Sequence, residues 1–304
     1  MTEPNNVAHL SADYSAPPDL KTYDILLCNI SGGKDSQAML DVVVEAAKNA
    51  GVGDRVVTVF CDLGDEDEWP GTKQLAAEHA AHYCVRHEIV FRQVPDGAGS
   101  MRQQGLTEHI ESRRQQKWPD KARRFCTSSM KRAPVHKLMT RLVAEKRAEG
   151  IIGRRVRILN IMGMQAEESI DRAAMVPYRN DARASNKTKR EVDEWLPLLD
   201  WKVQHVWARL AKTRTRIHPI YAVLPRLSCR FCVLAGRRHL VTAARLDPAG
   251  ARRRAELEAA MEHQFRPDVS MAQILAEAEA INRVDGPLAV DGLEIPNYIE
   301  IGEW

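Results

Sequence analysis

Residues 31–36 read Ser-Gly-Gly-Lys-Asp-Ser, a short glycine-rich turn that carries hydroxyl groups and a cation. Two consecutive glycines let the main chain take turn conformations in which several backbone N–H groups point the same way. Where such a turn opens a helix, the unpaired N–H groups and the helix dipole both favour a bound anion. Ser31 and Ser36 add hydroxyl donors, and Lys34 adds an ammonium group. The turn therefore predicts a phosphate-binding site.

The segments on both sides of the turn can hold it in this geometry. Residues 23–28 are a short apolar run, which is typical of a buried parallel strand. Residues 37–47 have the apolar spacing of a helix, which we expect to end near Gly51. The turn is neither of the Walker type nor of the Gly-x-Gly-x-x-Gly dinucleotide type, because its glycines and lysine are spaced differently.

The next segments alternate between strand and helix patterns. Residues 55–61 and 88–94 are rich in β-branched and apolar residues and predict two further strands. Residues 72–86 between them predict an amphipathic helix, and residues 157–162 predict a fourth strand. Strands that alternate with helices predict a doubly wound, mostly parallel α/β sheet.

An acidic stretch follows the second of these strands. Ligands of an open parallel sheet bind at the carboxyl ends of its strands, so Asp62 is placed to contact a nucleotide or its Mg²⁺. We interpret Asp65, Glu66 and Asp67 as a solvated turn.

The sequence of the turn at 31–36 resembles the pyrophosphate-binding loop (PP-loop) of the adenine nucleotide alpha-hydrolase superfamily, whose fold is HUP-type. It resembles in particular the phosphoadenosine phosphosulfate (PAPS) reductase family. Residues 123–134, 163–172 and 195–207 resemble later blocks of that family, so the likeness extends over about residues 23–235. The resemblance implies cleavage of ATP between its α and β phosphates, with Mg²⁺ bridging the phosphates and AMP and pyrophosphate as products.

The block at 163–172 carries one departure from the family pattern. Gly163 and Arg172 match, but Gln165 replaces the usual arginine and cannot offer a charged fork to a second phosphate or a sulfate. The candidate catalytic residues are Lys34, Asp35, Asp62 and Arg172. The candidate nucleotide-binding residues are Ser31, Gly32, Gly33, Lys34, Asp35, Ser36, Asp62 and Gly163.

Three of the six cysteines are candidate metal ligands. Cys229 and Cys232 have the Cys-x-x-Cys spacing of a chelating pair. Cys126 lies where cluster-binding sulfonucleotide reductases carry adjacent cysteines, but here Thr127 takes the second position. Three thiolates are compatible with a [4Fe–4S] cluster that has one open iron, or with zinc and a fourth donor such as His239. The softness of thiolates favours iron–sulfur.

The remaining cysteines and the overall composition predict an ordinary soluble protein. Cys28, Cys61 and Cys84 lie in or beside apolar patterns, where a cysteine usually acts as a small hydrophobic residue. With 44% hydrophobic and 28% charged residues, no apolar run long enough to span a bilayer and no secretory signal, the sequence predicts a cytoplasmic protein.

Positive charge is unevenly distributed. The formal net charge is only +3, yet residues 102–157 are rich in arginine and lysine and poor in acids. A basic face of this size suits nucleotide phosphates or a nucleic acid, while a solvated helical surface is an equal alternative.

The chain is expected to comprise three parts. Residues 1–21 predict a flexible arm, residues 22–235 the PP-loop α/β domain with the cysteine blocks, and residues 236–304 a helical C-terminal extension with its tail. Within the second part, residues 178–191 are charged and predict a mobile loop. Asp200 is a candidate N-cap of the helix that follows it.

Three functions remain open at this point. The first is a PP-loop sulfurtransferase, which adenylates an acceptor such as a nucleic acid and takes sulfur from a donor protein such as a cysteine desulfurase. The second is a PAPS or adenylylsulfate reductase, whose family uses a cysteine near the C-terminus; this sequence has no cysteine after Cys232. The third is a nucleotide- or nucleic-acid-binding module with structural zinc and no turnover.

Overall fold

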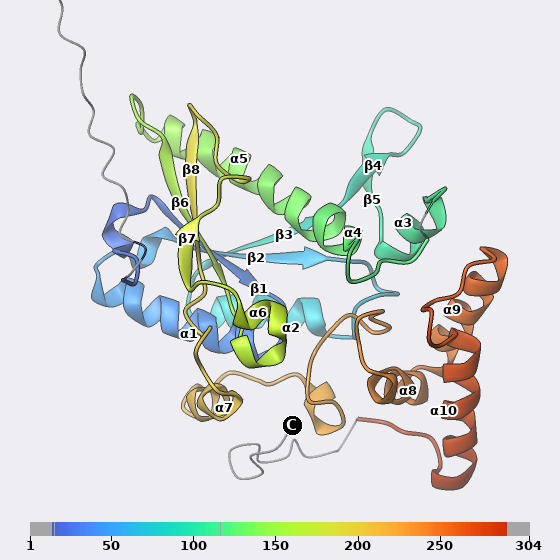
Figure 1. Ribbon diagram of the computed structural model, residues 1–304. Coiled ribbons are helices and arrows are strands. Elements are labelled where there is room, and N and C mark those ends of the chain that lie inside the picture. Colours follow the sequence, from blue (N-terminus) through green and yellow to red (C-terminus); the bar gives the residue numbers. More distant parts are fainter. Residues whose placement is uncertain (1–13, 15, 116, 291–304) are drawn as a thin grey trace, which may run out of the picture.

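A six-stranded sheet forms the centre of the molecule (Figure 1). The computed structural model describes residue 14, residues 16–115 and residues 117–290. The strand order is β3–β2–β1–β6–β8–β7, and all neighbours pair in parallel except the edge strand β7, which is antiparallel to β8. The strands are β1 Ile25–Ile30, β2 Val56–Asp62, β3 Arg86–Phe91, β6 Val156–Met162, β7 Tyr178–Asn180 and β8 Arg190–Trp195, and a separate hairpin consists of β4 Gln93–Pro95 and β5 Met101–Gln103.

Helices connect the strands and extend the chain beyond the sheet. They are α1 Lys34–Asn49, α2 Thr72–His82, α3 Leu106–Ser112, α4 Phe125–Thr127, α5 Ala133–Ala148, α6 Ile170–Ala173, α7 Val203–Leu210, α8 Arg237–Leu246, α9 Pro248–Ala260 and α10 Met271–Asp285. A π-helical turn, Ser128–Arg132, joins α4 to α5, and short 3₁₀ turns lie at Leu20–Thr22, Gly53–Arg55, Ala166–Glu168 and Pro219–Ala222. No helix in these described ranges is both long and apolar enough to cross a bilayer.

Both faces of the sheet are covered because its side chains alternate between two cores. Leu26 and Ile30 of β1 belong to the core that includes α1 and α7. Ile25 and Leu27 of the same strand face the other core, which α5 covers. Figure 1 shows α5 on one side of the sheet and α1, α2 and α7 on the other. This confirms the doubly wound, mostly parallel α/β fold.

The C-terminal helices are continuous with the larger core. Leu240 of α8 and Ile274 of α10 belong to the same hydrophobic cluster as Leu26 of β1. Of the predicted N-terminal arm, residues 1–13 and 15 lie outside the described residues, as does the tail from 291 onward. Tyr14 donates a hydrogen bond to Asp193 Oδ1 at 3.0 Å. The division of the chain into three parts stays a prediction.

The charged segment 178–191 is ordered, so the prediction of a mobile loop was wrong. It forms β7, a turn and the start of β8. The Arg190 guanidinium is buried and donates to the carbonyl oxygens of Ala184 (2.6 Å) and His136 (3.0 Å). The charge-rich composition was misleading because the polar groups are satisfied inside the fold, which removes the penalty of ordering them.

Asp200 is not an N-cap, which corrects a second prediction. It is exposed, and α7 begins at Val203 with Lys202 in the cap position. Glu167, from another element, accepts the Val203 N–H at 2.6 Å and satisfies the start of the helix. Such a distant cap leaves no local signal in the sequence.

Candidate active site

The turn between β1 and α1 brings the start of a long helix to the carboxyl end of the sheet. Gly32 has φ +72°, a backbone conformation that residues other than glycine rarely adopt. A Cβ at this position would also lie 3.0 Å from the Thr72 carbonyl oxygen. Gly33 is the extended N-cap of α1. Within the described part of the chain, the N–H groups of Gly32 and Gly33 donate no hydrogen bond. These two donors are available to an anion at the helix N-terminus.

Two other N–H groups of the turn already have partners. Ser31 N donates to Ser36 Oγ at 3.0 Å, and the Ser36 hydroxyl donates to Gly33 O at 2.9 Å, so Ser36 shapes the turn. Lys34 N donates to the hydroxyl of Tyr221 at 2.8 Å. Tyr221 was not among the predicted site residues because it lies 187 residues away in the sequence and belongs to no recognisable pattern.

Lys34 is buried at the start of α1 with its ammonium held in place. Nζ donates to Asp35 Oδ1 at 2.7 Å and to Gln165 Oε1 at 3.3 Å, which leaves one of its three N–H donors without a partner among the described residues. Gln165 is itself buried and donates to Trp201 O at 2.9 Å. The residue that replaces the family's arginine therefore orients Lys34 in this chain.

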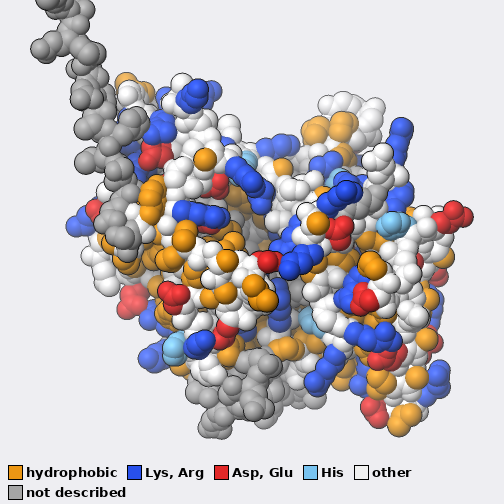
Figure 2. Space-filling model, in the orientation of Figure 1, with side chains coloured by type: hydrophobic (Ala, Val, Ile, Leu, Met, Phe, Trp, Pro, Cys, Tyr) orange, Lys and Arg blue, Asp and Glu red, His pale blue; other side chains and the backbone are white. Residues whose placement is uncertain are grey.

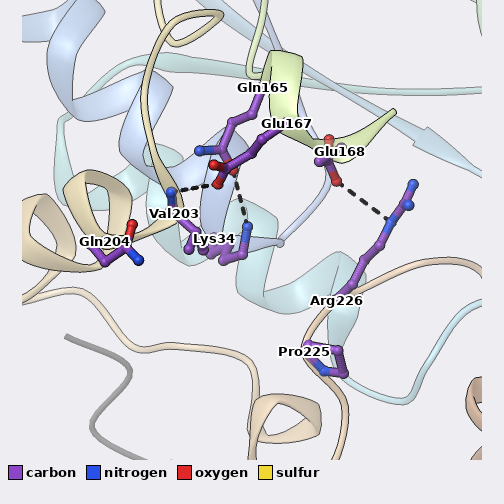
Figure 3. Close-up of a pocket in the computed structure, with 8 residues that line it drawn as sticks. All are labelled: Lys34, Gln165, Glu167, Glu168, Val203, Gln204, Pro225 and Arg226. Atoms are coloured by element: carbon purple, nitrogen blue, oxygen red, sulfur yellow. Dashed lines mark hydrogen bonds and ion pairs between the residues drawn. The ribbon is translucent and has the colours of Figure 1, made fainter. Parts of the chain in front are cut away.

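A cavity of about 420 Å³ opens beside Lys34 (Figure 3). Its lining residues are Lys34, Gln165, Glu167, Glu168, Val203, Gln204, Pro225 and Arg226. The volume lies within the range of about 300–1,000 Å³ that is typical of small-molecule sites. Glu168 pairs with Arg226, with Nε and Oε1 at 3.6 Å, and also with Arg172. Figure 3 shows Lys34 and Gln165 directed toward one another at one side of this space.

Asp62 lies outside the lining of this cavity. It is the last residue of β2, and Oδ1 accepts the Gly64 N–H at 2.9 Å while Oδ2 pairs with Lys73 Nζ at 2.9 Å. Both oxygens of this buried carboxylate therefore have partners within the protein.

Gly163 lies directly beside the start of α1. It follows β6, and a Cβ at this position would lie 2.4 Å from the Asp35 carbonyl oxygen. No side chain fits there without displacing the first turn of α1. The glycine thus allows close contact between the end of β6 and the first turn of α1.

Replacing Gly163 with alanine is expected to destabilise the fold by about 1–3 kcal/mol or more, because the methyl group must push two packed backbones apart. The matched control is Gly236→Ala, since a Cβ at Gly236 meets nothing within 4 Å. Urea unfolding measures both free energies. A Gly163→Ala protein as stable as the control would contradict the close packing described here.

Cys229 and Cys232 form a hydrogen-bonded pair of thiols. The hydrogen bond from Cys229 lowers the pKa of Cys232 to about 6 against the opposing effect of burial, with Lys131 and Arg226 contributing. The same hydrogen bond and burial raise the pKa of Cys229. Cys232 is therefore the more acidic thiol of the pair, and the thiolate is the form that binds metals.

Cys126 lies within electrostatic reach of this pair. Burial raises its pKa, and the neighbouring Cys232 raises it further. Among the described residues, no three His, Cys, Asp or Glu side chains are close enough to hold one metal ion. His239, the alternative fourth donor, is hydrogen-bonded to Ser228 Oγ at 3.2 Å, and burial and Arg226 lower its pKa to about 4. The soft donor chemistry fits a metal or cluster, but Cys126 must move toward the pair for all three sulfurs to bind it.

Lys131 faces the same cysteines, which sequence reasoning did not anticipate. Lys131 is exposed at the surface, and the neighbouring Glu68, Cys229, Cys61 and Cys126 raise its pKa. Burial raises the pKa of Glu68 to about 7 and that of Cys61 to about 11. Cys61 Sγ lies 3.8 Å from Lys131 O, so this thiol borders the cysteine site although it was interpreted only as a hydrophobic residue.

A network of buried charges anchors the Cys-x-x-Cys loop, and it corrects the interpretation of the acidic turn. Asp67 is 4% exposed rather than solvated, and it pairs with the equally buried Arg254 of α9 at 2.7 Å. Arg230, between the two cysteines, donates its N–H to Asp67 O at 2.8 Å and its guanidinium to Glu68 O at 2.5 Å. Arg230 also pairs with Asp247 at 2.6 Å. The turn after β2 and the C-terminal helices thus hold the cysteine loop.

Replacing Arg254 with methionine should destabilise the protein by about 3–5 kcal/mol, because it leaves the buried Asp67 carboxylate unpaired. The control is Arg252→Met on the same helix, whose ion pair with Glu279 is exposed and is worth about 1 kcal/mol or less. Equal losses of unfolding free energy in the two variants would refute the anchoring role.

The family model of the phosphoadenosine phosphosulfate reductase domain matches residues 25–233. This chain belongs to the phosphoadenosine phosphosulfate reductase domain family. The match begins at β1 and ends just after Cys232, so the family domain includes both the turn at 31–36 and the cysteine loop. Comparison with curated protein sequences gave no significant match.

Solved structures similar to this member of the family are distant in sequence. One is PAPS reductase from Candida auris in a phosphate complex, with 16% identity, TM-score 0.40, and coverage of 66% of this chain and 78% of that chain. Another is the U34-tRNA thiolase NcsA from Methanococcus maripaludis with its [4Fe–4S] cluster, with 14% identity, TM-score 0.42, and coverage of 93% and 82%. A third is FMN adenylyltransferase from Candida glabrata, with 14% identity and TM-score 0.36; the match covers 66% of this chain and about half of that enzyme (52%).

Proposed function

We propose that this chain is a cytoplasmic PP-loop ATP pyrophosphatase that adenylates an acceptor and serves as an iron–sulfur-dependent sulfurtransferase. The observation that carries the proposal is the turn at 31–36. Two N–H donors without partners among the described residues lie at the N-terminus of α1. The partly satisfied ammonium of Lys34, in the first turn of the same helix, lines the cavity. Membership of the PAPS reductase domain family supports a nucleotide as the anion.

Each group at the turn has a role in the first step. An acceptor oxygen attacks the α phosphorus of ATP, a new O–P bond forms, and the bond to the bridging oxygen breaks as pyrophosphate leaves. The N–H groups of Gly32 and Gly33 and the dipole of α1 stabilise the charge on the departing pyrophosphate. Lys34 donates its remaining N–H to the same group, while Asp35 and Gln165 fix the direction of the ammonium. Mg²⁺ carried by ATP neutralises part of the triphosphate charge.

The cysteine site accounts for the second step. A sulfur nucleophile attacks the adenylated carbon, a C–S bond forms, and AMP leaves with the acceptor oxygen. Cys126, Cys229 and Cys232 would hold the cluster, which supplies an open iron for sulfur, with zinc as the alternative metal. The sulfur must come from a donor protein such as a cysteine desulfurase, and an external thiol must supply two electrons to reduce the donor's persulfide to the sulfide that attacks. Lys131 and Arg226 offset the negative charge of the thiolates, since both lower the pKa of Cys232.

Sulfonucleotide reduction is the second candidate, because the family model is that of a reductase domain. In the family that chemistry needs a thiol beyond the Cys-x-x-Cys block, and no cysteine follows Cys232 in this sequence. The experiment is anaerobic purification with iron, sulfide and zinc quantified, followed by assays of pyrophosphate release from ATP and of sulfite release from PAPS. Iron with pyrophosphate release supports the sulfurtransferase. Sulfite release supports the reductase, and zinc without either activity supports a binding module.

A further inference from the structure

The basic segment 102–157 consists of two unequal halves. From residue 141 onward most of the cations are neutralised within the fold by acidic partners from several elements, while Arg147 donates to the carbonyl oxygen of Thr188. These ion pairs are Arg141 with Glu88, Lys146 with Glu149, Arg154 with Asp24, Arg155 with Glu191 and Arg157 with Asp193. This half of the segment has little charge left for a polyanion.

The part before residue 141 is different, apart from Arg102, which pairs with Glu108. Arg114, Arg123, Arg124, Arg132 and Lys137 are exposed, and within the described ranges none of them forms an ion pair. Several flank the helix start that carries Cys126. Lys121, in the segment between α3 and α4, pairs with Asp171 of α6 at 3.3 Å. This ion pair places the segment beside α6.

Three guanidinium groups, those of Arg124, Arg172 and Arg226, lie near one another where the segment between α3 and α4 meets α6. Burial and the charges of Arg226 and Arg124 lower the pKa of Arg172 to about 10, although Asp35 opposes this effect. Glu168 is the carboxylate paired with both Arg172 and Arg226. Figure 2 shows Lys and Arg side chains along the hollow in the middle of this face. Such an excess of positive charge next to the start of α1 favours a second anion beside the nucleotide.

We propose that a single strand of nucleic acid binds along Arg123, Arg124, Arg132, Arg172 and Arg226, here called the basic track, and places its reacting nucleotide in the cavity beside Lys34. This rests on the proposed function, for which it names the acceptor and its path. A base paired in a duplex cannot enter a concave site of this size, so the reacting nucleotide must be unpaired.

The composition of the surface indicates how the strand is read. Among the exposed large hydrophobic residues of the described part, Tyr14 is the one aromatic residue, while Tyr83, Trp195 and Trp201 are half-buried. Few aromatic faces are therefore fully open to the stacked bases that single-strand-binding proteins commonly use. Arginine contacts to phosphates then dominate. Binding is accordingly strongly salt-dependent and only weakly sequence-dependent.

The test compares two double variants that remove the same charge. Arg123→Gln/Arg132→Gln lies on the basic track, and Arg141→Gln/Arg252→Gln removes two exposed cations that have acidic partners. Fluorescence anisotropy with a labelled RNA strand, and with a DNA strand of the same sequence, gives the affinity between about 50 and 200 mM salt. The track variant should bind about tenfold more weakly, and its salt slope should fall by about 1.4, or ~0.7 per lost phosphate contact. The control should stay within about twofold of the native protein, and the RNA and DNA arms show which sugar is preferred.

Three results would overturn the basic track. They are an equal loss in the two double variants, no binding of either strand by the native protein at low salt, and tighter binding of a duplex than of its separate strands. If the native protein still converts ATP to AMP and pyrophosphate in the presence of a different acceptor, the proposed function survives while the track does not.

Discussion

Replacing Lys34 with methionine is expected to reduce pyrophosphate release from ATP by about 100-fold or more. The substitution keeps the length of the buried side chain but removes the ammonium that stabilises charge on the leaving group, and loss of one such donor typically costs about 10²–10³ in rate. The ammonium already lies against Asp35 and Gln165 in the free protein, so it needs no reorganisation when the nucleotide binds. The rate of pyrophosphate release at saturating ATP measures the effect.

The matched control is Lys48→Met, at the opposite end of the same helix. It removes an equal charge from α1 but lies far from the turn in sequence and fold. Both variants should keep the thermal stability and the metal content of the native protein. A Lys34→Met protein with native activity would show that the turn does not bind the departing phosphates.

Replacing Cys229 with serine should abolish metal binding while leaving ATP binding intact. The hydrogen bond from Cys229 lowers the pKa of Cys232, so the substitution removes one proposed ligand and makes a second less acidic. Iron, sulfide and zinc per chain, measured after anaerobic purification, should fall to background. The affinity for ATP should stay within about twofold, because the turn at 31–36 lies on β1 and α1 and not on the cysteine loop.

Cys84→Ser is the control for this variant, since Cys84 is exposed and belongs to no cluster of thiols in the described structure. Metal loss in both proteins would indicate nonspecific binding. Retention of metal in Cys229→Ser would show that the Cys-x-x-Cys pair is not the site. Joint loss of ATP binding and metal in Cys229→Ser would argue against two separate sites.

The sheet and the position of the turn at 31–36 between β1 and α1 could be predicted because their signals are local. The apolar runs of β1, β2 and β6 and the glycine pair at 32–33 lie within a few residues of the structure they determine. Boundaries were less accurate. The third strand was expected to reach residue 94, but β3 ends at Phe91 and the chain turns into the β4–β5 hairpin.

The parts of the site that could not be predicted depend on contacts between distant segments. Tyr221 meets the start of α1, and Arg254 meets Asp67, across most of the chain. Lys131 was counted as one basic residue among many, although its position among thiols makes it different from its neighbours. The sequence did not show which arginines and lysines form ion pairs within the fold and which face solvent. Their acidic partners come from distant segments and meet them only in the folded chain.

Phosphorus NMR of the products formed from ATP in the presence of an acceptor tests the central claim most directly. If the turn at 31–36 holds the departing pyrophosphate, cleavage lies between the α and β phosphates and the spectrum shows AMP and pyrophosphate. The appearance of ADP and inorganic phosphate instead would place the cleavage at the γ phosphate and contradict this account of the site.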